Sequence, residues 1–192
     1  MNLEILETKV EIFRSSWFPE SGANQPFWFK ARSAHFYSTI HDLCSQLMEC
    51  VDTVLLQPDA KEFLNFLKEA RWSSQNILYL AVMLDQMPRN ALATNFGRFS
   101  SCDNRDTQTL IDDKFSYTFA CEILRLQMHA AITDERLICF FSLVFRHSNN
   151  LERAEEVLLR LSADASPERL PILGMKFWEE TQKRRKLLQI SP

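Results

Sequence analysis

The sequence is poor in glycine and has no long apolar run. Only 3 of its 192 residues are Gly, and neither G-x-G-x-x-G nor G-x-x-x-x-G-K occurs. This argues against phosphate-binding loops and tight β-hairpins, because both need glycine at positive φ. No window holds 18 uninterrupted apolar residues, so we expect no membrane-spanning helix.

The chain also lacks a surplus of basic charge and paired cysteines. Its formal net charge is −3, so bulk electrostatics does not favour nucleic acid as a partner. The one basic run, residues 183–186, lies near the end of an expected helix, where cations complement the helix dipole. Five scattered cysteines without C-x-x-C indicate free thiols in a reducing cytosol, and the acidic N-terminus is unlike a signal peptide. We therefore expect a cytoplasmic protein.

Helical periodicity covers almost the whole chain, and it is the strongest signal in the sequence. At this length a single domain, residues 1–192, can bury a large core rich in the 15 Phe residues. We predict an all-α array or bundle of about seven to nine helices. The expected helices are residues 2–14, 33–50, 59–70, about 74–84 after a cap at Ser73 or Ser74, 107–131, a helix capped by Thr133, 150–162, and a last helix opened by Ser166-Pro167.

The fourth of these helices is expected to be central, because residues 78–84 are apolar on every side. Pro88 disfavours helical backbone at Met87, which predicts that the buried helix stops there.

Four polar residues follow this apolar run: Asp85, Gln86, Arg89 and Asn90. A structural interpretation makes Asp85 the cap of a new turn, paired with Arg89 four residues on. A functional interpretation makes the cluster the floor of a pocket at the end of a buried helix. The residues alone leave both open.

A second polar group, "VFRHSNN" at 144–150, follows the most apolar helix face. Its His147 is the best candidate for a general acid or base, although the dipole at a helix C-terminus also accounts for a cation there. The other three histidines, His35, His41 and His129, are expected on helix surfaces.

Metal templates fit the sequence poorly. Asp112 and Ser116 have the i, i+4 spacing of a magnesium motif on a helix, but the i+8 position is Ala120. A second acidic group, residues 103–106, falls in a predicted loop. We therefore expect no cofactor, with magnesium as a weak alternative.

Residues 84–90, Leu-Asp-Gln-Met-Pro-Arg-Asn, resemble the hallmark of the domain-of-unknown-function family 924 of bacteria and fungi, which reads Leu-Asp-Gln-Phe-Pro-Arg-Asn after a buried helix. "SSWF" at 15–18, "FWF" at 27–29, "GRFS" at 97–100 and "FRHSNN" at 145–150 are similar to further family segments, in the same order. The similarity spans about residues 13–152. The chain departs from the family at Met87, at Asn149 where the family has Glu, and in lacking a C-terminal Gly-Arg-Phe-Pro-His-Arg-Asn motif.

This resemblance implies a tetratricopeptide-like fold and a pocket shared by Asp85, Arg89, Asn90 and His147. Some fungal members are associated with terpenoid biosynthesis, so it also implies a noncanonical terpene cyclase, or an accessory protein steering a cyclase product. Arg89 would hold an anionic group, and His147 or Asp85 would manage a proton.

The expected ligand is an apolar small molecule, with a partner cyclase as a candidate second protein. Trp17 and Trp28 would line the wall of the pocket and stabilise a cation. Gln86, Arg98 and Ser148 are the remaining expected ligand contacts. Two alternatives stay open: a helical module that binds a protein or peptide, and a small-molecule hydrolase or lyase that uses Asp85 and His147.

Overall fold

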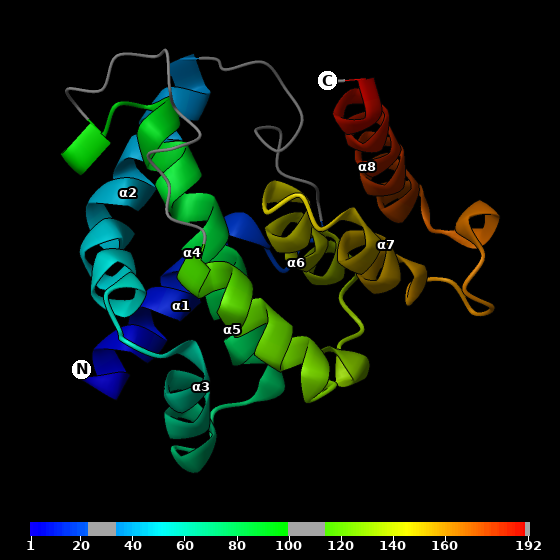
Figure 1. The fold of residues 1–192 in the computed structure, drawn as a ribbon. Coiled ribbons are helices and arrows are strands. Elements are labelled where there is room, and N and C mark those ends of the chain that lie inside the picture. Colours follow the sequence, from blue (N-terminus) through cyan, green and yellow to red (C-terminus); the bar gives the residue numbers. More distant parts are fainter. Residues whose placement is uncertain (23–33, 100–113, 191–192) are drawn as a thin grey trace.

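The computed structural model describes residues 1–22, 34–99 and 114–190, apart from the side chains of residues 34–36, 98 and 190. In these ranges the chain forms eight α-helices, three short 3₁₀ turns and no strand, which confirms the predicted all-α array (Figure 1). The helices are α1 Leu3–Trp17, α2 Ala34–Leu55, α3 Ala60–Glu69, α4 Ser74–Ala93, α5 Lys114–Arg125, α6 Glu135–His147, α7 Leu151–Leu159 and α8 Ile172–Ile190.

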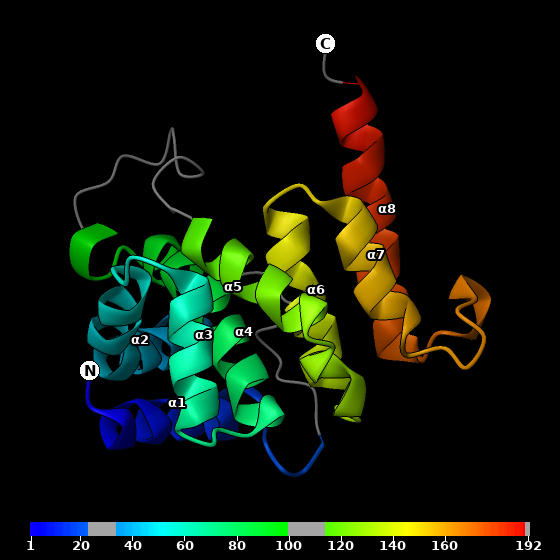
Figure 2. The same ribbon diagram turned by 60° about the horizontal axis from the view of Figure 1, so that its bottom comes forward.

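Helix α4 lies at the centre of this arrangement and packs against α1, α2, α5 and α6. Every residue from Ile77 to Pro88 is buried, as expected for a helix that is apolar all round. Helices α7 and α8 lie side by side at one end of the molecule and reach α4 through α6 (Figure 2). No helix in the described part of the chain is both long and apolar enough to span a membrane.

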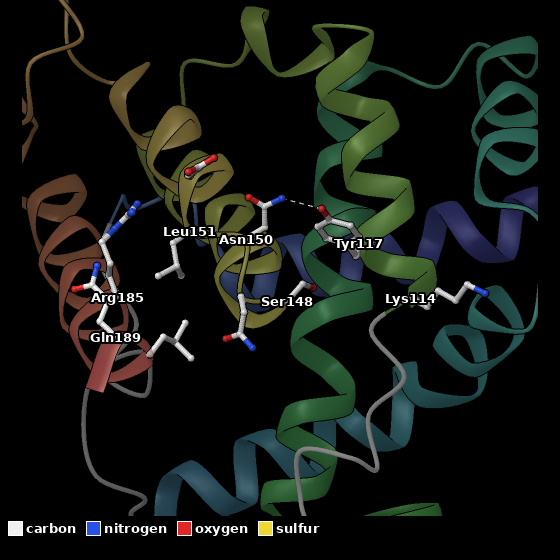
Figure 3. A pocket seen from close by; sticks show the side chains of 10 residues that line it. Lys114, Tyr117, Ser148, Asn150, Leu151, Arg185 and Gln189 are labelled. Carbon is white, nitrogen blue, oxygen red and sulfur yellow. Dashed lines mark hydrogen bonds between the residues drawn. The ribbon is translucent and has the colours of Figure 1, made fainter. Parts of the chain in front are cut away.

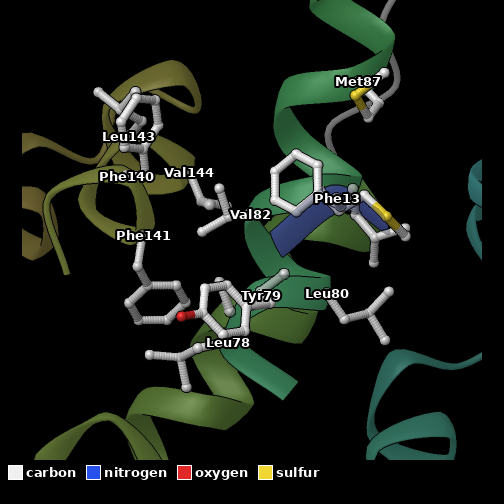
Figure 4. Packing of buried hydrophobic residues seen from close by; sticks show 14 of the residues in the cluster. Phe13, Leu78, Tyr79, Leu80, Val82, Met87, Phe140, Phe141, Leu143 and Val144 are labelled. Atoms are coloured by element: carbon white, nitrogen blue, oxygen red, sulfur yellow. The ribbon is translucent and has the colours of Figure 1, made fainter. Parts of the chain in front are cut away.

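Aromatic side chains fill the space between α1, α4 and α6 (Figure 4). Tyr79 and Val82 of α4 lie between Phe13 of α1 and the α6 residues Phe140 and Phe141. Four Phe side chains are fully buried: Phe13, Phe119, Phe141 and Phe145. A core of this kind fixes the distance between α4 and α6, because large rings lose many close contacts if the helices shift.

The prediction that the buried helix stops at Met87 is wrong, because α4 continues through Pro88 to Ala93. Proline removes one helical hydrogen bond and disfavours the preceding residue's helical backbone. Here the helix on both sides of Pro88 is held by tertiary packing, and Ala91 and Leu92 beyond it are buried. A hydrogen bond of 2.7 Å from Asn90 Nδ2 to the Gln86 carbonyl oxygen further supports this turn.

Several predicted helix limits also need correction. Of the expected helix 107–131, residues 107–113 lie outside the described part, and α5 ends at Arg125 because Gln127 is left-handed, with φ of 53°. A 3₁₀ turn, Met128–Ala131, follows. The cap of α6 is Asp134 and not Thr133, since the Asp134 side chain accepts a hydrogen bond from the Arg136 amide at 2.9 Å.

At the C-terminal end, the expected helix 150–162 is shorter in the structure, Leu151–Leu159. Ser166-Pro167 opens only a 3₁₀ turn, Pro167–Arg169, and α8 begins at Ile172, directly after Pro171. Pro171 is the better start, because proline is tolerated at a helix N-terminus, where its missing N–H is not needed.

The prediction that His129 is a surface residue is wrong. Its side chain is 4% exposed, its ring lies 6.4 Å from that of Phe141, and burial lowers its pKa. His41 is exposed as expected, and the side chain of His35 is outside the described residues. Cys44, Cys50, Cys121 and Cys139 are free thiols, and burial raises the pKa of Cys44 to about 12.

Candidate functional site

Asp85 is the centre of a polar cluster inside the helical core. Its carboxylate is 1% exposed. Oδ2 accepts a hydrogen bond of 2.6 Å from Gln86 Nε2 and lies 2.8 Å from His147 Nδ1. Oδ1 accepts one of 3.1 Å from Arg89 Nε. Asp85, Gln86 and Arg89 come from α4 and His147 comes from α6, so the cluster joins these two helices. Asp85 and His147 are 62 residues apart in sequence.

The charges around Asp85 keep its carboxylate ionised. Burial by itself raises the pKa of an acid, because it penalises the charged form. The charges and hydrogen bonds of His147 and Arg89 act in the opposite direction and together prevail, lowering the pKa of Asp85 to about 2. A carboxylate fixed in this way accepts hydrogen bonds and does not donate them at neutral pH.

His147 differs from Asp85 in reaching the surface, since 23% of its side chain is exposed. Because Nδ1 faces Asp85, the ring edge that carries Nε2 points away from the carboxylate. The residue lines a depression of about 270 Å³ between the end of α6 and helix α8. Its other lining residues are Arg146, Glu180, Lys183, Arg184 and Leu187.

Arg146 also lines this depression and was not among the predicted site residues. Its side chain makes no hydrogen bond or ion pair with any residue in the described ranges. Burial lowers the pKa of its guanidinium, and the negative charges of Glu180 and Asp85 only partly offset this. In the sequence Arg146 is one of several polar residues ending a helix, and only the packing of α8 against α6 gives it these surroundings.

Two arginines of the basic run 183–186 connect α8 to neighbouring segments. Arg185 donates to Glu155 of α7 at 2.7 Å, whereas Lys183 pairs with Glu180 at 2.6 Å within α8. Arg184 donates two hydrogen bonds, of 3.2 and 2.9 Å, to Asn149 Oδ1. The run ends before the last turn of α8, so these lateral contacts account for it better than the helix dipole does.

Asn149 itself has a left-handed backbone, with φ of 58°. This conformation ends α6 and is one that Asn adopts more readily than most residues. The turn thereby directs the Asn149 side chain to Arg184.

The remaining predicted site residues are divided between several places. Asn90 lies one turn beyond Gln86 on α4 and bonds to its carbonyl oxygen. Ser148 donates to the Val144 carbonyl oxygen at 3.1 Å, which closes the last turn of α6. Trp17 packs in the core, with its ring 5.4 Å from that of Phe13. Trp28 and the side chain of Arg98 lie outside the described residues.

A second, larger depression of about 670 Å³ lies on the other side of the turn between α6 and α7 (Figure 3). Asn150 donates from Nδ2 to the hydroxyl of Tyr117 at 2.8 Å and thereby ties this turn to α5. Ser148, Arg185 and Gln189 also line the depression. It is shallow, and His147 is not among its lining residues.

The candidate magnesium ligands give no site that the structure describes. Asp112 and residues 103–106 are outside the described residues, and Ser116 is buried in α5. Within the described ranges, no three His, Cys, Asp or Glu side chains are grouped so that they could hold a metal ion.

No protein-family model, no curated protein and no solved structure matches this chain. The resemblance to family 924, the tetratricopeptide-like fold and the terpenoid role that the resemblance implies therefore stay predictions.

Proposed function

We propose that the protein is an enzyme in which His147, oriented by Asp85, acts as a general base on a small molecule. The observation that carries the proposal is the distance of 2.8 Å between His147 Nδ1 and the buried carboxylate oxygen Oδ2 of Asp85. An ionised carboxylate only accepts hydrogen bonds, so Nδ1 must carry the proton. The neutral imidazole then has its lone pair on Nε2, at the ring edge that points away from Asp85.

The supporting groups around Asp85 suit this role. Gln86 and Arg89 donate hydrogen bonds to the two oxygens of the same carboxylate, so the imidazole has a fixed partner. A carboxylate in contact with a histidine sets the tautomer and stabilises the imidazolium that forms when Nε2 takes a proton. In a hydrolysis, Nε2 would take a proton from water as the hydroxide attacks, and would return it to the leaving group.

This proposal corresponds to the hydrolase or lyase alternative more directly than to the terpene cyclase. Arg89, the expected anion-binding residue, is bonded to Asp85, and Trp17 is packed in the core. The groups that line the depression beside His147 are polar and charged, apart from Leu187.

The direct test is the tautomer of His147, read from long-range ¹H–¹⁵N NMR spectra of the labelled protein. We expect the neutral ring to carry its proton on Nδ1 and to move it only when Asp85 is replaced by Asn. A neutral ring protonated on Nε2 would contradict the proposal. The exposed His41 provides the internal reference within the same spectra.

Activity is tested with a panel of model esters, amides and phosphate esters. We expect His147→Gln to lower kcat by about 10² or more on any substrate that the wild type turns over. His41→Gln is the matched control and should retain full activity. Turnover that survives His147→Gln unchanged would exclude His147 as the base.

A further inference from the structure

The depression between α6 and α8 has an excess of positive charge. Three cationic side chains line it, Arg146, Lys183 and Arg184, against the one anionic side chain of Glu180. Lys183 and Glu180 neutralise each other in an ion pair. This leaves a surplus of two positive charges, on Arg146 and Arg184, beside the imidazole of His147.

Within the described residues, neither of these two arginines donates a hydrogen bond to an anionic side chain, and the charges of Glu180 and Asp85 only partly offset the effect of burial on Arg146. Arg184 donates only to the amide oxygen of Asn149, which is a neutral acceptor. Arg146 makes no side-chain hydrogen bond or ion pair within the described part of the chain. Arg146 is half-buried, and a guanidinium that is partly removed from water loses hydration that no hydrogen-bond acceptor in the described residues replaces.

A helix C-terminus attracts cations, and this dipole is the competing explanation for Arg146. It does not account for the burial, because a cation that complements a helix dipole can remain in water. Two of the carbonyl groups near the end of α6 also already accept from backbone donors. The Phe145 oxygen accepts from Asn150 N at 2.9 Å, and the Arg146 oxygen from Asn149 N at 3.1 Å.

We infer that this depression binds the phosphate dianion of a small phosphorylated substrate, with Arg146 as its principal ligand and Arg184 and Lys183 at its rim. Two surplus positive charges match a dianion, and the planar fork of an arginine matches two phosphate oxygens. A volume of about 270 Å³ admits a phosphate group with a short organic part. The inference rests on the proposed function, since it names the substrate class for His147.

The experiment follows the His147 imidazole and the arginine Nε–H signals by NMR while inorganic phosphate is added. A parallel titration with potassium chloride at equal ionic strength removes the effect of screening. We expect saturable shifts with a millimolar dissociation constant for so small a probe. Shifts that do not saturate, or that chloride reproduces, would overturn the inference.

Variants assign the binding to the named residues. We expect Arg146→Gln to weaken phosphate binding about tenfold or more, and Arg146→Lys to weaken it less, because lysine keeps the charge but loses the fork. Arg125→Gln, at an exposed ion pair with Glu122, is the matched control and should bind as the wild type does. Equal affinity in Arg146→Gln and wild type would refute the assignment.

Lys183→Gln gives an independent check if Arg146 variants fail to fold, because Lys183 is exposed at the rim. We expect it to weaken binding about threefold, and no change would count against the inference. A titration with a short alkyl phosphate then distinguishes a phosphate monoester from free phosphate as the ligand. Tighter binding than inorganic phosphate indicates a phosphate monoester, and equal binding indicates free phosphate.

The same spectra report the tautomer of His147, so the two proposals fail separately. A histidine protonated on Nδ1 without phosphate binding would refute the substrate class alone, whereas one protonated on Nε2 would refute the general base.

Discussion

At the scale of single residues, Asp85 is the group on which the site depends. A buried carboxylate is costly unless donors surround it, and here Gln86, Arg89 and His147 all face it within 3.1 Å. The contact also joins α4 to α6. One carboxylate therefore serves both the fold and the orientation of the histidine.

Replacing Asp85 by Asn should destabilise the protein by about 3 kcal/mol at neutral pH, because Arg89 then loses its buried counter-charge and His147 loses the carboxylate that accepts from its Nδ1. Urea unfolding, followed by circular dichroism, measures the change in the free energy of unfolding. Asp42→Asn, at an exposed position of α2, is the control and should change stability by less than about 0.5 kcal/mol.

Acid should remove the stabilisation that the ionised Asp85 carboxylate gives to the wild type. The pKa of Asp85 is about 2 in the folded protein against its ordinary value of 3.8, so the stabilising contribution is present above about pH 4. It is lost as the pH falls from about 4 to about 2, and its full size is about 2 kcal/mol. The stability difference between the wild type and Asp85→Asn should narrow over that range. A difference that is constant with pH would contradict the lowered pKa.

At the scale of secondary-structure elements, polar residues beside the apolar stripes set most helix ends. Ser73, one of the two caps that the sequence predicted, caps α4 through a hydrogen bond from the Asn76 amide. The local pattern misled at Pro88, where the buried surroundings of α4 outweigh a backbone preference, and at Thr133, where the adjacent Asp134 takes the capping position. Local rules compare neighbours in the chain and do not include the energy of burial.

Asn150 has two roles at the start of α7. Its Oδ1 accepts from the Arg153 amide, and its Nδ2 donates to Tyr117 of α5. We expect Asn150→Ala to lower the free energy of unfolding by about 1.5 kcal/mol, since it removes both bonds.

Tyr117→Phe removes the link to α5 and leaves the cap, so its loss should be smaller, about 0.5–1 kcal/mol. Thermal unfolding compares the two variants with the wild type. Equal losses in both would show that the cap adds nothing to the stability of α7.

At the scale of the whole molecule, stability should differ between the centre and the α7–α8 end. Helix α4 is surrounded by α1, α2, α5 and α6, whereas α8 packs mainly on α6 and α7. Leu187 and Leu188, near the end of α8, are 61% and 41% exposed. A helix with few neighbours can open without disturbing the rest of the core.

Hydrogen exchange with mass spectrometry checks this difference. We expect peptides covering Ile77–Leu84 to exchange only through global unfolding, and peptides covering 183–190 to exchange faster by orders of magnitude. Strengthened protection of 183–190 on adding phosphate would agree with a ligand held between α6 and α8. Equal protection of α4 and α8 without ligand would contradict the expected gradient.

The sequence by itself determined the helical class, the approximate helix positions and the buried central helix, because the periodicity of apolar residues records which face each helix buries. It also marked Asp85 and His147 as unusual, since each belongs to a polar group that directly follows a strongly apolar segment. The resemblance implied that these two side chains share a pocket, but only the tertiary structure decided that they meet at 2.8 Å and that Arg89 donates to Asp85. It also placed Arg146, which makes no side-chain hydrogen bond or ion pair within the described residues, in the depression beside α8. These facts depend on how α4, α6 and α8 pack together, and residues 62 positions apart carry no local signal of their contact.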